Sequence, residues 1–399
     1  MSKIAIYFRM FSPYILARLN AASRVADVVG IEGSRRSSNY AWEPRTGGEA
    51  FERLTLFEDR AVELVPNADV MAEIGRVLDR VQPEVVVVGG WSHIEALAMI
   101  RWARVNERHV IIMSESTAVD FKRTAFREHF KRRLVRLADA AIVGGQPQRR
   151  YITQLGLDAE RVFIGYDAVD NTYFAAAGHD ARMTPGLRQL LQLPHAYFVA
   201  SGRFIAKKNF DGLIRAYADY LRSASDNAWD LVLVGDGPLR TELEGLVSSL
   251  NLQGRVHFPG FLQYDEFPAI LGLAGAFVHV SLSEQWGLVV NEAMASGLPV
   301  IVSRQCGCAE DLVEDGVNGW AVDACSTHEI AARLADMVTA DRAAMSEAAL
   351  ARIAQYGPTR FEAAMSSALE AVRRLPVRNL SLIDRALIAA LVTRDTSAT

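Results

Sequence analysis

Two cations stand beside a glycine in the second half of the chain. Arg203 and Lys208 follow Gly202, which ends a short apolar run, and a helix is expected to begin just after them. That arrangement would present free helix amides and two positive charges to one anionic group, above all a diphosphate. An alternative for this stretch taken alone is a solvated turn with incidental basic residues.

Two carboxylic acids, Glu284 and Glu292, follow in a second stretch, eight positions apart. The first is expected in a loop and the second about one turn into the next helix, so that they would point at two parts of one extended ligand. Carboxylates accept hydrogen bonds from sugar and ribose hydroxyls, and Gly287 would let the backbone approach that ligand. Acids beside cations suit a ligand with hydroxyls and phosphates. The alternative is a surface glutamate pair that the helix dipole favours.

Short β-branched apolar runs alternate with amphipathic stretches through both halves of the chain. Strands are expected at 4–8, 85–89, 110–113, 140–143, 197–201, 231–234, 256–258, 276–280 and 299–302. Helices are expected at 69–81, 95–105, 209–221, 239–250 and 288–296. This alternation predicts an α/β fold with parallel sheets covered on both faces.

The pattern weakens over 171–194, where glycines and prolines predict a linker. We therefore expect a first domain at 1–175 and a second at 190–356, which suits a chain of 399 residues. Helices expected at about 361–392 are predicted to pack back on the first domain. The cleft between two such doubly wound domains, at the carboxyl ends of their strands, is the expected place for a ligand.

The second half resembles glycosyltransferase family 4, which comprises retaining enzymes with the GT-B fold. The resemblance is carried by Gly202-Arg203 with Lys208, Gly235-Asp236-Gly237-Pro238, Val256-His257-Phe258-Pro259-Gly260, the Glu284 and Glu292 pair, and Glu310-Asp311-Leu312-Val313 with Gly316 and Asn318-Gly319. It implies two Rossmann-like domains that face a central cleft. It also implies transfer of a hexose-type sugar from a nucleotide-diphosphate sugar to a saccharide or lipid-linked acceptor, in cell-surface polysaccharide or glycoconjugate synthesis.

The resemblance also implies roles for individual residues. Arg203 and Lys208 look like the pair that neutralises the leaving diphosphate, and Glu292 like the acid that holds the ribose. Glu284 is similar to the acid that contacts the donor sugar. The remaining donor-binding residues implied are Gly202, Gly237, Pro238, Phe261, Gly287 and Leu288.

The first half departs from the family pattern on the acceptor side. The turn after the first strand, residues 9–14, lacks the paired glycines that the family often has. The family also often places a histidine after a middle strand, near the reacting sugar, whereas here Glu115 follows the strand at 110–113. His93, after the strand at 85–89, is the other catalytic candidate. A hydrogen-bonded structural histidine is the alternative for His93.

No cofactor or metal is expected, and the nucleotide sugar, UDP- or GDP-linked, would be a substrate. The chain contains no Asp-x-Asp pair, which would bridge a metal to the diphosphate in the GT-A class. Cys306, Cys308 and Cys325 offer neither a disulfide framework nor the two ligand pairs of a structural zinc site. A formal net charge of -4 argues against a nucleic-acid binder.

A basic helix expected at 121–137 carries phenylalanines and leucines between its lysines and arginines. It would suit peripheral contact with an anionic membrane, or it is a surface helix whose apolar face belongs to the core. No apolar stretch approaches the length of a membrane span. The expected location is cytoplasmic, with the inner face of the cell membrane as the peripheral alternative.

Two other functions fit the same residues. A GT-B nucleotide-sugar epimerase would release free nucleotide without an acceptor. A non-catalytic partner subunit would bind the nucleotide sugar without turning it over.

Overall fold

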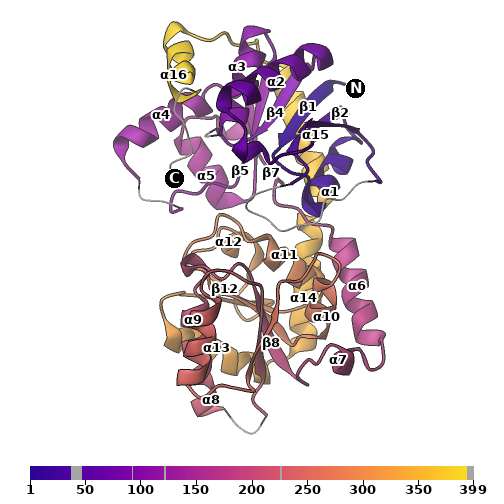
Figure 1. Ribbon diagram of the computed structural model, residues 1–399, viewed down its shortest axis with the longest axis vertical. Coiled ribbons are helices and arrows are strands. Elements are labelled where there is room, and N and C mark those ends of the chain that lie inside the picture. Colours follow the sequence, from indigo (N-terminus) through magenta and orange to yellow (C-terminus); the bar gives the residue numbers. More distant parts are fainter. Residues whose placement is uncertain (37–46, 92, 121–122, 225–226, 393–399) are drawn as a thin grey trace. The chain divides into compact units, whose positions relative to one another are not determined.

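The computed structural model describes residues 1–36, 47–91, 93–120, 123–224 and 227–392 (Figure 1). Phe121 and Lys122 of the expected basic helix lie outside the described residues. The chain forms two compact units, and the first is made of two separate segments. Unit 1 comprises Met1–Ala168 and Pro358–Thr399, and unit 2 comprises Val169–Gly357.

Unit 1 is built on a parallel sheet of seven strands in the order β3-β2-β1-β4-β5-β6-β7. The strands are β1 (Lys3–Phe8), β2 (Asp27–Ser34), β3 (Glu52–Phe57), β4 (Val85–Gly89), β5 (His109–Ser114), β6 (Ala140–Val143) and β7 (Val162–Ile164). The four strands expected in this half are confirmed as β1, β4, β5 and β6. The chain continues to one side of β1 through β2 and to the other through β4, so the strand order reverses between β1 and β4.

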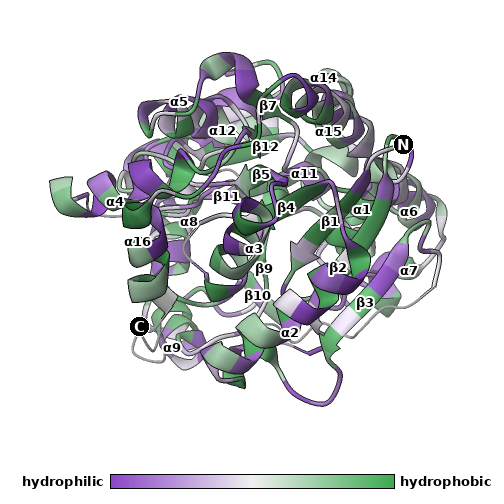
Figure 2. Cartoon of the chain, turned by 90° about the horizontal axis from the view of Figure 1, so that it is seen from above, coloured by the Kyte–Doolittle hydropathy of each residue, from purple (hydrophilic) through white to green (hydrophobic). Residues whose placement is uncertain are grey.

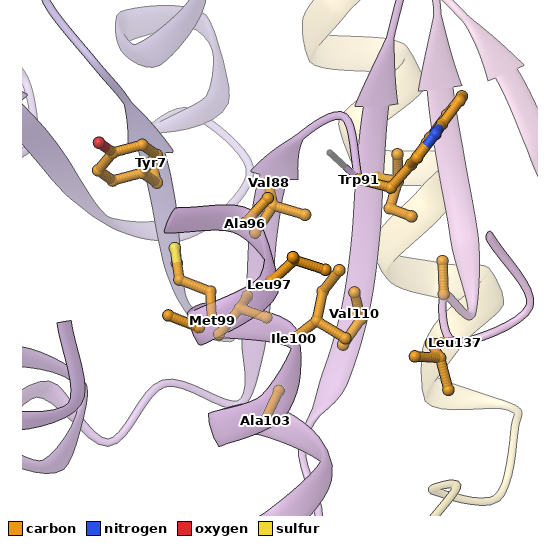
Figure 3. Close-up of a cluster of buried hydrophobic side chains, with 14 of the residues drawn as sticks. Tyr7, Val88, Trp91, Ala96, Leu97, Met99, Ile100, Ala103, Val110 and Leu137 are labelled. Carbon is orange, nitrogen blue, oxygen red and sulfur yellow. The ribbon is translucent and has the colours of Figure 1, made fainter. Parts of the chain in front are cut away.

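Helices cover both faces of this sheet, whose strands are mostly hydrophobic (Figure 2). They are α1 (Pro13–Ala22), α2 (Asn67–Val81), α3 (Ile94–Val105), α4 (Ala125–Val135), α5 (Gln146–Gln154), α15 (Pro358–Arg373) and α16 (Leu382–Val392), with short 3-10 turns η1 (Val62–Leu64) and η2 (Ala159–Arg161). The core on one face includes Val88, Leu97 and Ile100 (Figure 3). Helix α16 packs against α3 on this same face, and on the other face α15 packs against α1, β6 and β7.

Unit 2 is built on a parallel sheet of six strands in the order β10-β9-β8-β11-β12-β13. The strands are β8 (Tyr197–Ser201), β9 (Asp230–Val234), β10 (Val256–Gly260), β11 (Ala276–His279), β12 (Val300–Ser303) and β13 (Gly319–Val322). The strand order reverses between β8 and β11, which lie side by side in the sheet. All five strands expected in this half are confirmed.

Along the chain, most helices of unit 2 connect one strand of its sheet to the next. They are α6 (Asn171–Met183), α7 (Leu187–Leu190), α8 (Phe210–Ser223), α9 (Arg240–Ser249), α10 (Phe267–Leu273), α11 (Leu288–Ala295), α12 (Ala309–Leu312), α13 (Thr327–Thr339) and α14 (Arg342–Ile353), with turns η3 (Ala206–Lys208) and η4 (Ala354–Tyr356). Of the described helices, none combines the length and the apolar character that crossing a bilayer requires.

The linker expected at 171–194 is wrong, because α6 and α7 occupy most of it. Helix α6 begins with a cap in which Asp170 accepts a hydrogen bond from the Tyr173 amide at 3.0 Å. Gly178 suggested a chain break, but in the structure it is a packing residue. A Cβ on Gly272 of α10 would lie 2.5 Å from the carbonyl oxygen of Gly178. The expected domains were 1–175 and 190–356. In the structure, the chain instead passes from unit 1 to unit 2 between Ala168 and Val169.

Candidate active site

The carboxyl ends of β8 and β11 bring the expected cation and the expected acid together in unit 2. Lys208 closes the turn η3 after β8, and Glu284 lies in the loop after β11. The Lys208 ammonium forms an ion pair with Glu284, and Lys207 lies 3.8 Å from the same carboxylate. The two residues are 76 positions apart in sequence, so their contact depends on the pairing of β8 with β11.

Asn209 fixes the backbone that carries Lys208. It adopts a left-handed conformation with φ 58° at the start of α8, a region that asparagine tolerates better than most residues. Its buried side chain donates hydrogen bonds to the carbonyls of Val280 at 3.0 Å and Ala324 at 2.8 Å. The sequence predicted Asn209 only as the start of the helix at 209–221, and these two contacts with distant carbonyls were not expected.

The loop that carries Glu284 is held by a neighbouring segment. Glu284 pairs with Cys306 in an isolated parallel bridge, and the Gly307 amide donates to the Glu284 carbonyl at 2.9 Å. Burial raises the pKa of the Cys306 thiol to about 12, and the Glu284 charge adds to the effect. The thiol is therefore protonated and inert at neutral pH. The contribution of Cys306 to the site is its backbone bridge to Glu284.

His279 is a buried residue of the site that was not predicted from the sequence. It ends β11, with Nε2 3.9 Å from a Glu284 carboxylate oxygen and 3.3 Å from the Ser281 hydroxyl. Burial lowers the pKa of His279 to about 3, and the Lys208 charge lowers it further. The imidazole is neutral at physiological pH. Nothing in the sequence distinguishes this histidine from an ordinary core residue.

The charge of Glu284 follows from two opposing effects. Burial raises the pKa of its carboxyl, but the charge and hydrogen bond of Lys208, together with His279 and Lys207, outweigh burial, and the net shift is downward. Glu284 is therefore an ionised acceptor of hydrogen bonds at neutral pH, and it is poorly suited to donate a proton.

The glycine turns expected to bind the donor touch one another through their backbones. The Gly202 amide donates to the Val234 carbonyl at 3.1 Å. A Cβ on Gly235, whose φ is 135°, would lie 2.0 Å from the Gly202 carbonyl oxygen. Gly237 allows a similar approach to Phe204, whose backbone atoms would be 2.7 Å from a Cβ. The turns after β8 and β9, which include Gly202, Gly237 and Pro238, therefore form one wall.

The start of α11 adds backbone amides beside the charged cluster. Gly287 precedes α11 with φ 104°, and a Cβ there would lie 3.4 Å from His279 Nε2 and 3.5 Å from Glu284 Cγ. Leu288 is the first helical residue, and Glu292, one turn later, is 3% exposed.

Two other expected donor-binding residues lie at the ends of neighbouring strands. Phe261, directly after β10, is 44% exposed. Arg203, after β8, is an exposed cation, and within the described parts of the chain its side chain has no ion pair.

The acceptor-side candidates lie in unit 1. His93 caps α3 after β4, and its Nδ1 is 3.1 Å from Nη2 of Arg9, which directly follows β1. The same guanidinium binds Glu95 at 2.8 Å. Glu115 directly follows β5, and the buried Asp167 lies near enough to sense its charge. Burial raises the pKa of Asp167, and the Glu115 charge adds to this shift.

Part of the chain that carries these residues is similar to known proteins. Residues 188–354 match the family model of glycosyl transferases group 1. That segment contains the charged cluster and the glycine turns of unit 2. An alpha-D-kanosaminyltransferase of Streptomyces kanamyceticus is 34% identical over 179 residues, 44% of each chain. A lipopolysaccharide core biosynthesis glycosyltransferase of Rhizobium meliloti is 41% identical over 125 residues, 31% of this chain and 34% of the other. The matches thus span less than half the length of these relatives.

The fold has solved counterparts over nearly the whole chain. The structure of Anabaena HepE in complex with UDP and glucose superposes with a TM-score of 0.71 and 20% identity, and covers 93% of this chain and 100% of that one. With a parallel α/β sheet in each unit, this likeness shows that the chain has the GT-B fold, as the sequence predicted.

Proposed function

We propose that this chain is a retaining glycosyltransferase of the family 4 type. It transfers a hexose-type sugar from a UDP- or GDP-linked donor to a saccharide or lipid-linked acceptor in glycan synthesis. The observation that carries the proposal is the Lys208–Glu284 ion pair at the strand-order reversal of unit 2, between the glycine turns and the start of α11. Such a reversal, at the carboxyl ends of parallel strands, is where open α/β sheets bind ligands.

In this proposal, unit 2 stabilises the leaving nucleotide diphosphate. An ammonium has three donor hydrogens, so Lys208 can keep its bond to Glu284 while it contacts a phosphate oxygen. Arg203 adds a second cation, and the amides at the start of α11 add partial positive charge. As the bond between the sugar C1 and the diphosphate oxygen breaks, these fixed charges offset the negative charge that develops on the leaving group. No metal is included, because the cations take this role.

Glu284 and Glu292 bind hydroxyls in this proposal. The ionised Glu284 carboxylate accepts hydrogen bonds from the donor sugar, and Glu292 accepts those of the ribose. Support for a nucleotide-sugar donor comes from HepE, which was solved with UDP and glucose, and from the glycosyltransferase relatives. Glu115 and His93 are the candidates for contact with the acceptor.

Helix α4 is proposed to contact anionic lipid when the acceptor is lipid-linked. Phe126 is 73% exposed, and Arg127 and Arg132 are exposed on the same helix. Leu134 and Val135 are buried and attach the end of the helix to unit 1. An exposed aromatic beside arginines suits the interface of an anionic membrane.

A panel of UDP-, GDP- and ADP-sugars with candidate acceptors tests the function. Nucleotide release that depends on an acceptor supports the transferase. An epimerised free sugar supports the epimerase, and tight binding without turnover supports the partner subunit. Within an active enzyme, Glu292→Ala should mainly weaken donor binding and Arg203→Ala should mainly lower turnover. Wild-type kinetics in both variants would remove those two assignments.

A further inference from the structure

A hydrogen-bonded chain of three side chains lies where the strand order of unit 1 reverses. Arg9 directly follows β1, and His93 and Glu95 stand at the start of α3 after the neighbouring strand β4. Arg9 binds Glu95 through both carboxylate oxygens, with Nε–Oε1 at 2.8 Å and Nη2–Oε2 at 3.3 Å. The Glu95 side chain is only 2% exposed. Two parallel bonds to a buried carboxylate hold the guanidinium in one orientation.

The orientation of Arg9 determines which nitrogen of His93 carries the proton. Arg9 Nη2 lies 3.1 Å from His93 Nδ1. A guanidinium has donors and no acceptor, so this contact is a hydrogen bond only if Nδ1 is unprotonated and accepts. A neutral imidazole has a single ring proton, which must then sit on Nε2.

The charged groups around the imidazole favour its neutral form. His93 is an exposed residue, but partial desolvation and the positive charge of Arg9 both lower its pKa, against a smaller opposite effect of Glu95. Glu63 of η1 and Tyr7 of β1 are the other titratable groups that act on Arg9. Protonation of Nδ1 would both break the bond to Arg9 and place two cations side by side.

We propose that Arg9 and Glu95 lock His93 in the Nε2–H tautomer, which makes His93 a hydrogen-bond donor and not a general base. Both nitrogens are then unable to take a proton from a hydroxyl, since Nδ1 is engaged and Nε2 already carries one. The group that His93 can serve is an oxygen with a free lone pair, such as a sugar hydroxyl or ring oxygen on the acceptor side. The tautomer is independent of the proposed function, whereas the contact with an acceptor oxygen rests on it.

Imidazole nitrogen NMR on the full chain tests the tautomer directly. In a ¹⁵N-labelled sample at pH 8 we expect the Nδ1 signal of His93 at the unprotonated position and the Nε2 signal at the protonated position. Arg9→Met should release the lock, so that the two nitrogens average and the pKa of His93 rises towards its ordinary value. Arg35→Met is the matched control, because Arg35 pairs with Glu58 on the surface of the same unit. Protonated Nδ1 in the wild-type chain would overturn the proposal, whether or not Arg9→Met folds.

Substitutions of His93 distinguish a role as hydrogen-bond donor from a role as general base. The amide nitrogen of glutamine can replace Nε2–H but cannot accept a proton. A donor role predicts that His93→Gln retains kcat within about threefold and that His93→Phe loses about tenfold, the worth of one hydrogen bond. A base role predicts that both variants lose about 100-fold or more and that the acid limb of the pH profile disappears. That second outcome would overturn the donor assignment. A locked tautomer in a chain without transferase activity would instead contradict the proposed function alone.

Discussion

At the scale of single residues, the charged cluster of unit 2 contains a lysine that controls the charge of a glutamate. Lys208 keeps the Glu284 carboxyl ionised against the effect of burial. Lys208→Met should leave burial dominant and raise the pKa of Glu284 above its ordinary value. Titration of the Glu284 side-chain carboxyl by ¹³C NMR measures this shift. Lys207→Met is the control, because Lys207 is 3.8 Å away and half exposed and should shift the pKa much less. Equal shifts in both variants would contradict this account.

His279 makes a second residue-scale prediction, about acid stability. Its pKa is lowered from 6.5 to about 3 by burial in the folded chain. The unfolded state therefore binds more protons between those pH values, and the stabilisation present above pH 6.5 is lost as the pH falls. Between pH 6.5 and pH 5 the wild-type chain should lose about 1.5 kcal/mol more than His279→Gln. Urea unfolding of both chains at the two pH values checks this, and identical losses would show that His279 does not titrate in this way.

At the scale of elements, the turn after β9 requires glycine for a spatial reason. Gly235→Ala would place a Cβ against the Gly202 carbonyl in a backbone conformation that alanine rarely adopts. We expect a loss of about 2–4 kcal/mol in the free energy of unfolding. Gly245→Ala, in the middle of α9 with no atom near its Cβ, should instead stabilise the chain by about 0.5–1 kcal/mol. Urea denaturation compares the two variants, and a tolerated Gly235→Ala would refute the close packing of the turns.

Helix α4 can be tested separately from the donor site. Burying one phenylalanine contributes about 1.5–3 kcal/mol, so Phe126→Asp should lower partitioning onto anionic vesicles about tenfold or more. Leu190→Asp is the control, because Leu190 is 77% exposed on α7 in the other unit. Co-sedimentation with phosphatidylglycerol vesicles measures both variants. If Phe126→Asp sediments like the wild-type chain, α4 is not the contact surface.

How much of each element the sequence reveals depends on where its partners lie. Uniform apolar runs such as β4 are recognisable locally, but β2 contains a buried acid, Glu32. Its carboxylate accepts hydrogen bonds from Arg53 of the neighbouring strand at 2.8 Å and from the Phe11 amide at 2.8 Å. Those partners become visible only in the assembled sheet, so β2 and β3 escaped prediction.

The candidate site shows the same division. Its glycines, Lys208 and Glu284 are recognisable from spacing, and the sequence predicted them. The contacts of Asn209, His279 and Cys306 join segments that follow different strands, and no local sequence pattern predicts them.

At the scale of the whole molecule, unit 2 is formed by one continuous segment of the chain, whereas unit 1 is formed by two separate segments. The segment of unit 2, Val169–Gly357, contains the whole charged cluster of Lys207, Lys208, His279 and Glu284. We expect this segment to fold when produced alone and to bind UDP or GDP, as measured by calorimetry. Residues 1–168 alone should not fold, because Phe361, Met365 and Leu369 of α15 are buried in the core of unit 1. Joining 168 to 358 through a short glycine-serine linker should restore folding. A stable 1–168 fragment would contradict this view of unit 1.

The divided composition of unit 1 imposes an order on biosynthesis. On the ribosome, the first strands emerge early, but the helix that completes their core, Pro358–Arg373, is translated only after all of unit 2. The nascent first half must therefore remain with one apolar sheet face only partly covered, by α1, until unit 2 has been translated. Chaperones that bind exposed apolar surface should bind residues 1–168 of the nascent chain. Codon changes that slow translation between 169 and 357 should prolong that binding.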